Sequence, residues 1–285
     1  MNTVSRLFAT AFARRAARVC LAFAVLLPFA HEASAQSDDL GTDVGLEVEK
    51  KLARGLSASL EGNYRTQDDC SQPERWSVGA GISYRLFQSS DKKFNVKANA
   101  GFEYIWQYNM KSVEPKTDAY DPALPLSKNP RNETAAYWRG RHRSSLGFSA
   151  NYAPSKRWDF QLKETFQYSH YNAKNSVART KWRYNDDDDL YSVAGTKRVK
   201  SKDRVVLRNR LSAGYDIKGL PLTPYAAADL GVGINYNAFK QKYTAGIDFK
   251  AAKQHRVGVF YRFQTENDDD EPNGHLLGCS YKFSF

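Results

Sequence analysis

The sequence predicts an all-β chain that closes into an antiparallel transmembrane β-barrel of 10 to 12 strands, with short periplasmic turns and longer extracellular loops. Three features lead to this prediction: an export signal at the N-terminus, repeated alternation of apolar and polar residues, and a last segment that ends on aromatic residues. In a membrane barrel every second side chain faces lipid and the others face the lumen, so alternation is the expected pattern.

The N-terminal 35 residues have the layout of a secretory signal. Residues 1–18 carry four arginines and no acid, an apolar run follows from Val19 to Ala30, and Ala33-Ser34-Ala35 supplies the small residues of a cleavage site. A membrane anchor is the alternative, but a helix needs about 20 apolar residues to span a bilayer. We therefore expect residues 1–35 to be a cleaved signal peptide, residues 36–285 to form a single barrel domain, and the protein to reside in the outer membrane of a Gram-negative cell.

The overall composition, taken alone, would suggest a soluble basic protein. The 285 residues carry a net charge of +11 and have a mean hydropathy of −0.64. Residues 1–35 contribute four arginines and one glutamate, a net +3, which leaves +8 after cleavage. Phosphate-rich lipopolysaccharide is the partner we expect for this charge, so no nucleic acid is required. The two cysteines of the mature chain, Cys70 and Cys279, are free to pair in an oxidising compartment, but their spacing does not demand it.

Alternation is clearest in residues 94–108, where the even positions are apolar or aromatic and most odd ones are polar or small. Helical spacing would instead place apolar residues three and four apart. Ten further segments show the same period: 43–52, 56–66, 76–86, 146–152, 158–168, 205–217, 223–233, 243–249, 257–263 and 275–285. Glu164 interrupts one apolar face and indicates a bulge or a shifted register.

The links between these segments alternate in length. Short links at 53–55, 87–93, 154–157, 218–222 and 250–253 interleave with longer polar ones at 67–74, 109–133, 172–200 and 265–274. Four tryptophans near segment ends, Trp76, Trp106, Trp138 and Trp158, suit the aromatic girdles of a membrane barrel. Because bacterial single-chain barrels have even strand numbers, eleven segments point to a true count of 10 or 12.

The polar faces of these segments place a stripe of charge inside the barrel. Its members are Arg139, Arg141, Arg143, Arg208, Arg210, Glu61, Glu103 and Asp229. Such a stripe can lower the barrier for anions, as charged rings do in pores. Alternatively the arginines cross-link strands through the three carboxylates and fill the lumen, which is the interpretation we favour for a barrel only modestly wider than an eight-stranded one.

No catalytic, metal-binding or cofactor motif is recognised in the sequence. His170, next to Ser169, and His275, next to an acidic run, are the rim candidates, and an isolated rim histidine is more often an interfacial side chain than a base. The acidic runs Asp186–Asp189 and Asp268–Glu271 match no EF-hand loop, so solvation is favoured over calcium binding. We expect no metal, no cofactor and no enzymatic activity.

The last segment alternates Tyr281, Phe283 and the terminal Phe285. This pattern resembles the signal by which the barrel-assembly machinery accepts outer-membrane proteins, which would make that machinery a partner.

Several short motifs are similar to those of an outer-membrane barrel family of unknown function, domain-of-unknown-function group 2490. They are Tyr152–Trp158, the Arg-x-Arg-Leu run at 208–211 followed by Gly214-Tyr215, Pro224-Tyr225 with Asp229 behind it, and the final aromatic strand. The resemblance covers most of residues 40–285. It implies a porin-like barrel fold and an outer-membrane location, and it implies nothing about mechanism.

Three functions remain open from the sequence. The first is a narrow, anion-preferring channel or a structural component of the outer membrane. The second is a surface adhesin or receptor that acts through the segments 109–133 and 172–200. The third is a lipid- or peptide-cleaving barrel enzyme, which would need a polar dyad at the rim.

Overall fold

The computed structural model describes residues 39–116, 123, 125, 128–184, 190–267 and 273–285. The predicted signal peptide and its cleavage site lie outside these residues, as do the acidic runs at 186–189 and 268–271. Within the described residues, no helix is long and apolar enough to cross a bilayer.

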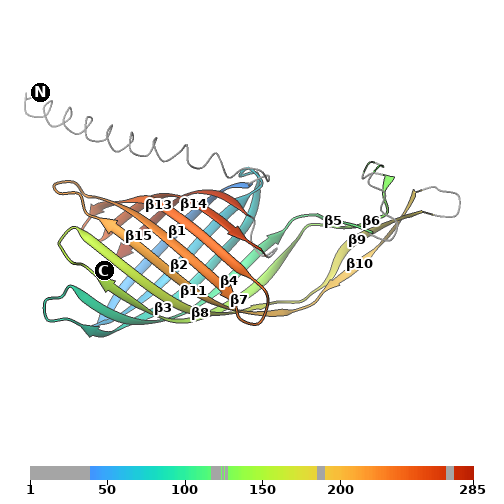
Figure 1. Cartoon of the computed structure of the whole chain (residues 1–285). Coiled ribbons are helices and arrows are strands. Elements are labelled where there is room, and N and C mark those ends of the chain that lie inside the picture. Colours follow the sequence, from blue (N-terminus) through green and yellow to red (C-terminus); the bar gives the residue numbers. More distant parts are fainter. Residues whose placement is uncertain (1–38, 117–122, 124, 126–127, 185–189, 268–272) are drawn as a thin grey trace, which may run out of the picture. The chain divides into compact units, whose positions relative to one another are not determined.

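Eleven strands form a closed barrel (Figure 1). In sequence order they are β1 (Asp39–Ala53), β2 (Leu56–Gln67), β3 (Gln72–Gln88), β4 (Phe94–Asn109), β7 (Tyr137–Tyr152), β8 (Trp158–Tyr171), β11 (Lys202–Tyr215), β12 (Leu222–Gly233), β13 (Phe239–Ala252), β14 (His255–Glu266) and β15 (Gly274–Ser284). Each of the eleven predicted segments overlaps one of these strands, and only 205–217 and 275–285 run past a strand end, at Tyr215 and Ser284. The links after β1, β3, β7, β11 and β13 fall at one end, here called the short-turn end, and the other links, which include the three longest, fall at the other, the long-loop end.

The odd number of strands overturns the parity argument made from the sequence. With eleven strands the first and the last run in the same direction, and the barrel closes by a parallel pairing of β1 with β15, from Asp39 opposite Gly274 to Glu49 opposite Ser284. All other neighbouring barrel strands pair antiparallel. Gly274 has φ +145°, and a Cβ there would overlap the backbone of Asp39, so only glycine fits where the seam begins.

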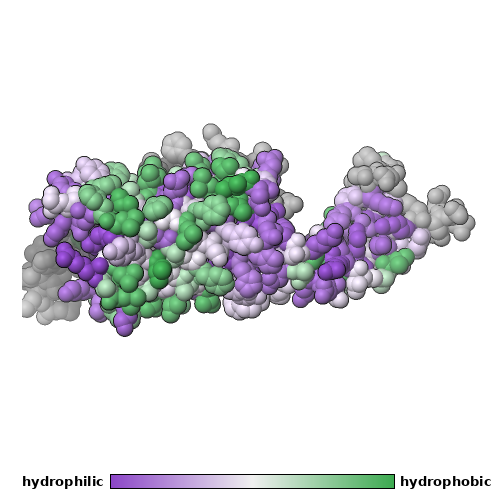
Figure 2. Space-filling view, turned by 90° about the horizontal axis from the view of Figure 1, so that it is seen from below, coloured by the Kyte–Doolittle hydropathy of each residue, from purple (hydrophilic) through white to green (hydrophobic). Residues whose placement is uncertain are grey.

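The outer wall of the barrel is apolar, because alternate residues of each strand point away from the lumen. Leu46, Leu60, Val78, Leu146 and Val259 are all more than half exposed on this wall. Figure 2 shows apolar side chains over the wall of the barrel and hydrophilic ones gathered toward its two ends. A wall of this kind is stable only against lipid.

Aromatic clusters flank the apolar wall at both ends, as predicted. Trp76 and Trp106 stack at 4.2 Å at the long-loop end. Trp158 lies 5.7 Å from Phe160 and 4.9 Å from Tyr215 at the short-turn end.

Glu164 is exposed on the outer wall in the middle of β8. The pairings of β8 with β7 and β11 run through this residue without a bulge or a change of register. The predicted irregularity is therefore wrong, and the chain carries a carboxylate on its lipid-facing surface.

Beyond the long-loop end, two connections that the sequence suggested were loops contain a second sheet. Its strands are β5 (Ser112–Pro115), β6 (Arg131–Thr134), β9 (Lys174–Tyr184) and β10 (Leu190–Val199), in the spatial order β10-β9-β6-β5. It is largely hydrophilic (Figure 2). Lys111 and Arg131 each approach Glu133 to 2.7 Å and hold the pKa of its carboxyl below the ordinary value. These strands were not predicted because they are largely polar. They therefore lack the alternation of apolar and polar residues that identified the barrel strands.

Candidate functional site

The lumen contains a cavity of about 650 Å³ whose lining comes from all eleven barrel strands. On β1 the lining runs from Asp43 to Glu49, and on β8 from Lys163 to Tyr171, so the cavity follows much of the barrel's length. Since each water in the liquid occupies about 30 Å³, this space could hold on the order of twenty waters.

Charge dominates the lining of this cavity. Twelve lysines and arginines face six aspartates and glutamates, a positive excess of six. The six acids are Asp43, Glu47, Glu49, Glu61, Glu103 and Asp229. Because most of them lie on β1, β2 and β4, while most of the cations lie on the strands from β7 to β14, the two signs are concentrated on different parts of the wall.

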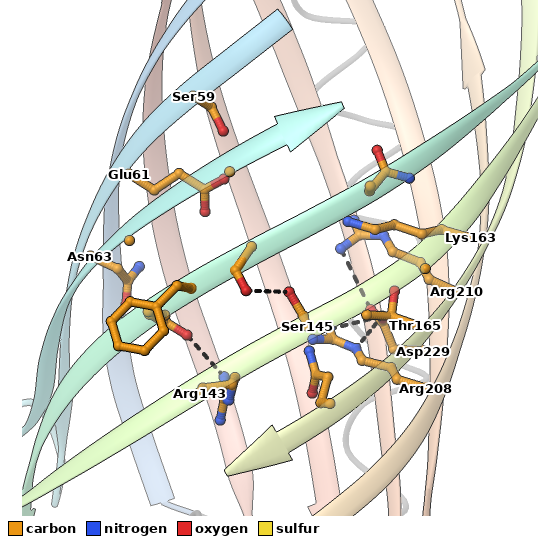
Figure 3. Close-up of a pocket in the computed structure, with 18 of the residues that line it drawn as sticks. Ser59, Glu61, Asn63, Arg143, Ser145, Lys163, Thr165, Arg208, Arg210 and Asp229 are labelled. Carbon is orange, nitrogen blue, oxygen red and sulfur yellow. Dashed lines mark hydrogen bonds and ion pairs between the residues drawn. The ribbon is translucent and has the colours of Figure 1, made fainter. Parts of the chain in front are cut away.

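Asp229 on β12 is a point of ion pairing in the basic part of the wall. Arg208 approaches its carboxylate to 2.8 Å and Arg210 to 3.6 Å, and the side chain of Asp229 is only 4% exposed (Figure 3). The two arginines keep about a third of their side-chain surface exposed. This part of the predicted stripe therefore cross-links β11 to β12 while still facing the cavity.

The rest of the stripe forms only part of the cross-linking between arginines and carboxylates that the sequence suggested. Arg143 pairs with Glu103 at 3.2 Å, as expected. Glu61 points into the lumen (Figure 3) and lies opposite Glu47 in the β1/β2 pairing. In the described part of the chain, Glu61 forms no ion pair with the arginine triplet.

Arg139 and Arg141 lie farther toward the long-loop end. The Nε and Nη2 of Arg139 donate to the carbonyls of Asn172 and Lys200, at 2.9 and 2.7 Å. The Nη1 of Arg141 donates to the phenol oxygen of Tyr171 at 2.6 Å, and this arginine is only 2% exposed. None of these three contacts involves the predicted carboxylates.

A buried network around Asp43 occupies the same end of the lumen, beside the seam. The carboxylate of Asp43 receives Arg65 at 3.2 Å and Arg262 at 2.8 Å, and the latter reaches from β14 past β15. Arg65 also approaches Glu74, whose side chain is 1% exposed. Nearer the short-turn end, the ammonium of Lys282 lies 2.7 Å from both Glu47 and Glu49. Ion pairs on the lumen side thus hold the parallel seam together.

A basic cluster gathers around one aromatic ring, that of Tyr171. Lys202 lies 4.6 Å from the ring centroid, and the guanidinium carbons of Arg141, Arg139 and Arg204 lie at 4.9, 5.1 and 5.6 Å. Arg204 also lies 4.5 Å from the ring of Tyr236. We call these four cations with Tyr171 the Tyr171 cluster. Arg141, Tyr171 and Arg204 line the cavity.

The histidines at the rim do not complete a nucleophile and base pair. The Nδ1 of His170 lies 2.7 Å from Asp203 on the outer surface, whereas Ser169 faces the cavity, because consecutive strand residues point to opposite faces. His275 hydrogen bonds Tyr261 at 2.5 Å. Within the described residues there is no group of three or more histidine, cysteine, aspartate or glutamate residues placed to hold a metal ion.

Asp43, Tyr171 and Lys202 were not among the predicted site residues, although the period of two could have found them. Asp43 continues the lumen face of Glu47 and Glu49 backward along β1, and Tyr171 continues the face of Thr165 and Ser169 to the end of β8. Tyr171 and Lys202 were missed because the predicted segments 158–168 and 205–217 stop short of the strand ends at the long-loop end. Asp43 lies within the predicted segment 43–52 but was not counted among the lumen charges.

The predicted assembly residues lie where the last strand closes the barrel. The rings of Phe283 and Phe285 stack at 5.3 Å, and Phe285 is 48% exposed. The backbone amide of Phe285 donates to Glu49 and its carbonyl accepts from Lys51, both at 3.0 Å. The terminal residue therefore extends the β1/β15 seam.

One family model matches residues 44–275, and its description is a protein of unknown function, DUF2490. The chain belongs to this family. The match confirms the resemblance seen in the short sequence motifs. No curated protein matches the chain.

Two solved structures are similar to this chain. The β domain of the Bordetella autotransporter BrkA has a TM-score of 0.45 and 13% identity, over 82% of this chain and 86% of that chain. An anion-selective porin from Comamonas acidovorans has a TM-score of 0.23 and 12% identity, over 82% and 83%. These likenesses are too distant to bear on mechanism. The closed barrel with an apolar wall and a charged lumen is that of an outer-membrane β-barrel protein.

Proposed function

We propose that this protein is a narrow outer-membrane channel that prefers small anions. The observation that carries the proposal is the lumen cavity of about 650 Å³ with twelve cationic and six anionic side chains in its lining. A wall with this excess raises the local concentration of anions and lowers their barrier to passage, because charges close to a narrow pore act through the local field.

The ion pairs in the lumen are compatible with a hydrated passage. Arg208 and Arg210 remain about one third exposed while they contact Asp229. Lys163 and Glu61 line the same cavity from β8 and β2 (Figure 3), so charges of both signs border the space. Cross-linking of strands and contact with water thus occur at the same positions.

Planar-bilayer recording of the refolded mature chain tests the proposal. In a tenfold KCl gradient we expect discrete conductance steps with a reversal potential of the sign that chloride preference gives. Absence of steps, or a reversal potential of the opposite sign, would reject the channel.

Lys163→Glu is the variant that best separates lumen charge from folding, since Lys163 forms none of the salt bridges of the described residues. We expect this substitution to shift the reversal potential toward the value that cation preference gives. Lys181→Glu, on an exposed position of β9, makes the same change in net charge and should leave the reversal potential unchanged.

A further inference from the structure

The Tyr171 cluster is built by the register of three neighbouring strands. Tyr171, at the end of β8, lies directly opposite Arg141 on β7 and Lys202 on β11. Arg139 and Arg204 are two residues away on those strands, so they share the lumen face with their neighbours. The β-sheet therefore fixes four cationic side chains around one ring.

Burial distinguishes the cluster from an ordinary basic surface patch. Arg139, Arg141 and Tyr171 are 8%, 2% and 3% exposed, and Lys202 and Arg204 are of intermediate exposure. Like charges held this close in a partly desolvated setting repel one another, and an entering anion would relieve that repulsion.

The chemistry of the cluster favours an anion with several oxygens. An arginine that stacks on an aromatic ring uses the face of its guanidinium, and the N–H donors lie in the plane of that group, in a fork that matches phosphate oxygens. The guanidinium carbon of Arg204 lies over the rings of Tyr171 and Tyr236, at 5.6 and 4.5 Å from their centroids. A monovalent anion such as chloride offers no such match to a set of planar donors.

We propose that the Tyr171 cluster binds the phosphoryl group of an anionic solute at the long-loop entrance of the lumen. This inference rests on the proposed channel function, because it names the class of solute that the channel admits. The cluster borders the lumen cavity and faces away from the lipid-facing wall. A soluble phosphate compound therefore reaches it more directly than the headgroup of a bilayer lipid does.

Isothermal titration calorimetry of the refolded mature chain in detergent, with inorganic phosphate as the probe at constant ionic strength, tests the site. We expect saturable binding of phosphate. Arg204→Gln and Lys202→Gln should each weaken it about tenfold, the effect of losing one hydrogen bond between charged groups. Lys253→Gln, an equal charge loss in an exposed turn at the short-turn end, should bind as the wild type does.

A second titration with dihexanoyl phosphatidic acid distinguishes the two sources of a phosphoryl group. Binding of inorganic phosphate that depends on Arg204 supports a soluble solute, and binding of the lipid alone that depends on Arg204 supports the site with a lipid as its ligand. Binding of neither probe, or binding that Arg204→Gln and Lys202→Gln leave unchanged, overturns the site. If phosphate binds but the bilayer recording shows no conductance, the channel proposal fails while the binding site stands.

Discussion

Two regions at the long-loop end of the lumen use arginine in different ways. In the Asp43 network a buried carboxylate receives Arg65 and Arg262, at 3.2 and 2.8 Å, and joins β1 to β2 and β14. In the Tyr171 cluster the cations surround an aromatic ring, and Arg139 donates to two backbone carbonyls. The first region holds strands together, and the second concentrates positive charge at the entrance of the cavity.

The contrast shows that lining the lumen cavity and cross-linking strands are not exclusive roles for arginines. The predicted stripe divides between them: Arg143, Arg208 and Arg210 pair with carboxylates, whereas Arg139 and Arg141 belong to the Tyr171 cluster. What an arginine does here depends on its cross-strand neighbour, which the residue's own position in the sequence does not reveal.

Asp43→Asn should have the largest effect on stability. The substitution keeps the shape of the side chain but leaves Arg65 and Arg262 buried without its charge, and breaking a buried ion pair typically costs about 3–5 kcal/mol. Urea unfolding of the refolded protein in detergent measures this loss. Glu114→Gln, which removes an exposed partner of Lys197 in the β5/β6/β9/β10 sheet, should cost about 1 kcal/mol or less. Equal losses in the two variants would contradict the structural role of the Asp43 network.

Lys282→Met should have an intermediate effect, at the other end of the seam. Lys282 lies 2.7 Å from Glu47 and Glu49 and keeps 32% of its side-chain surface exposed, so water screens the lost interactions in part. We expect a loss of about 1–2 kcal/mol in the same unfolding assay. An unchanged free energy of unfolding would mean that backbone pairing alone closes β1 against β15.

Phe285→Ala should affect assembly more than stability. The ring is 48% exposed on the lipid side, so its removal sacrifices little packing, while its backbone bonds to Glu49 and Lys51 remain. We expect less folded protein in the outer membrane of cells and near-normal refolding in detergent, both judged by the mobility of unboiled samples on gels. An equal loss in both assays would show that Phe285 acts only by packing.

Glu164→Leu should have the smallest effect, and it should be stabilising. Glu164 is a carboxylate on the outer wall, outside both arginine regions, where a charged side chain is unfavourable against lipid. We expect a gain of about 1 kcal/mol in lipid vesicles, measured by urea unfolding. A loss would indicate that another molecule contacts Glu164 at this surface.

The period of two was enough to predict the barrel, its eleven strand segments and the lumen side of the charged stripe, because lipid imposes a strict rule on every spanning strand. It could not predict the parallel seam, because an even number of strands was inferred from a general tendency of bacterial barrels. The ion pairs of Lys282, Glu47 and Asp43 can be identified only once β1 is known to pair with β15. It also could not show that Arg208 pairs with Asp229 while Glu61, among the described residues, forms no ion pair with an arginine, because the partners depend on the cross-strand register. Ile105 is an apolar residue with 0% exposure on a face that was expected to be polar, so alternation does not predict every position of a strand either.

The most direct test of the account is the reversal potential of the Arg204→Gln channel, measured beside its unfolding free energy. If the Tyr171 cluster sets the field at the entrance and the Asp43 network sets stability, the reversal potential should move toward cations while the free energy of unfolding changes by about 1 kcal/mol or less. A reversal potential equal to that of the wild type, together with a loss of several kcal/mol, would contradict the division of roles and assign Arg204 to the structural network instead.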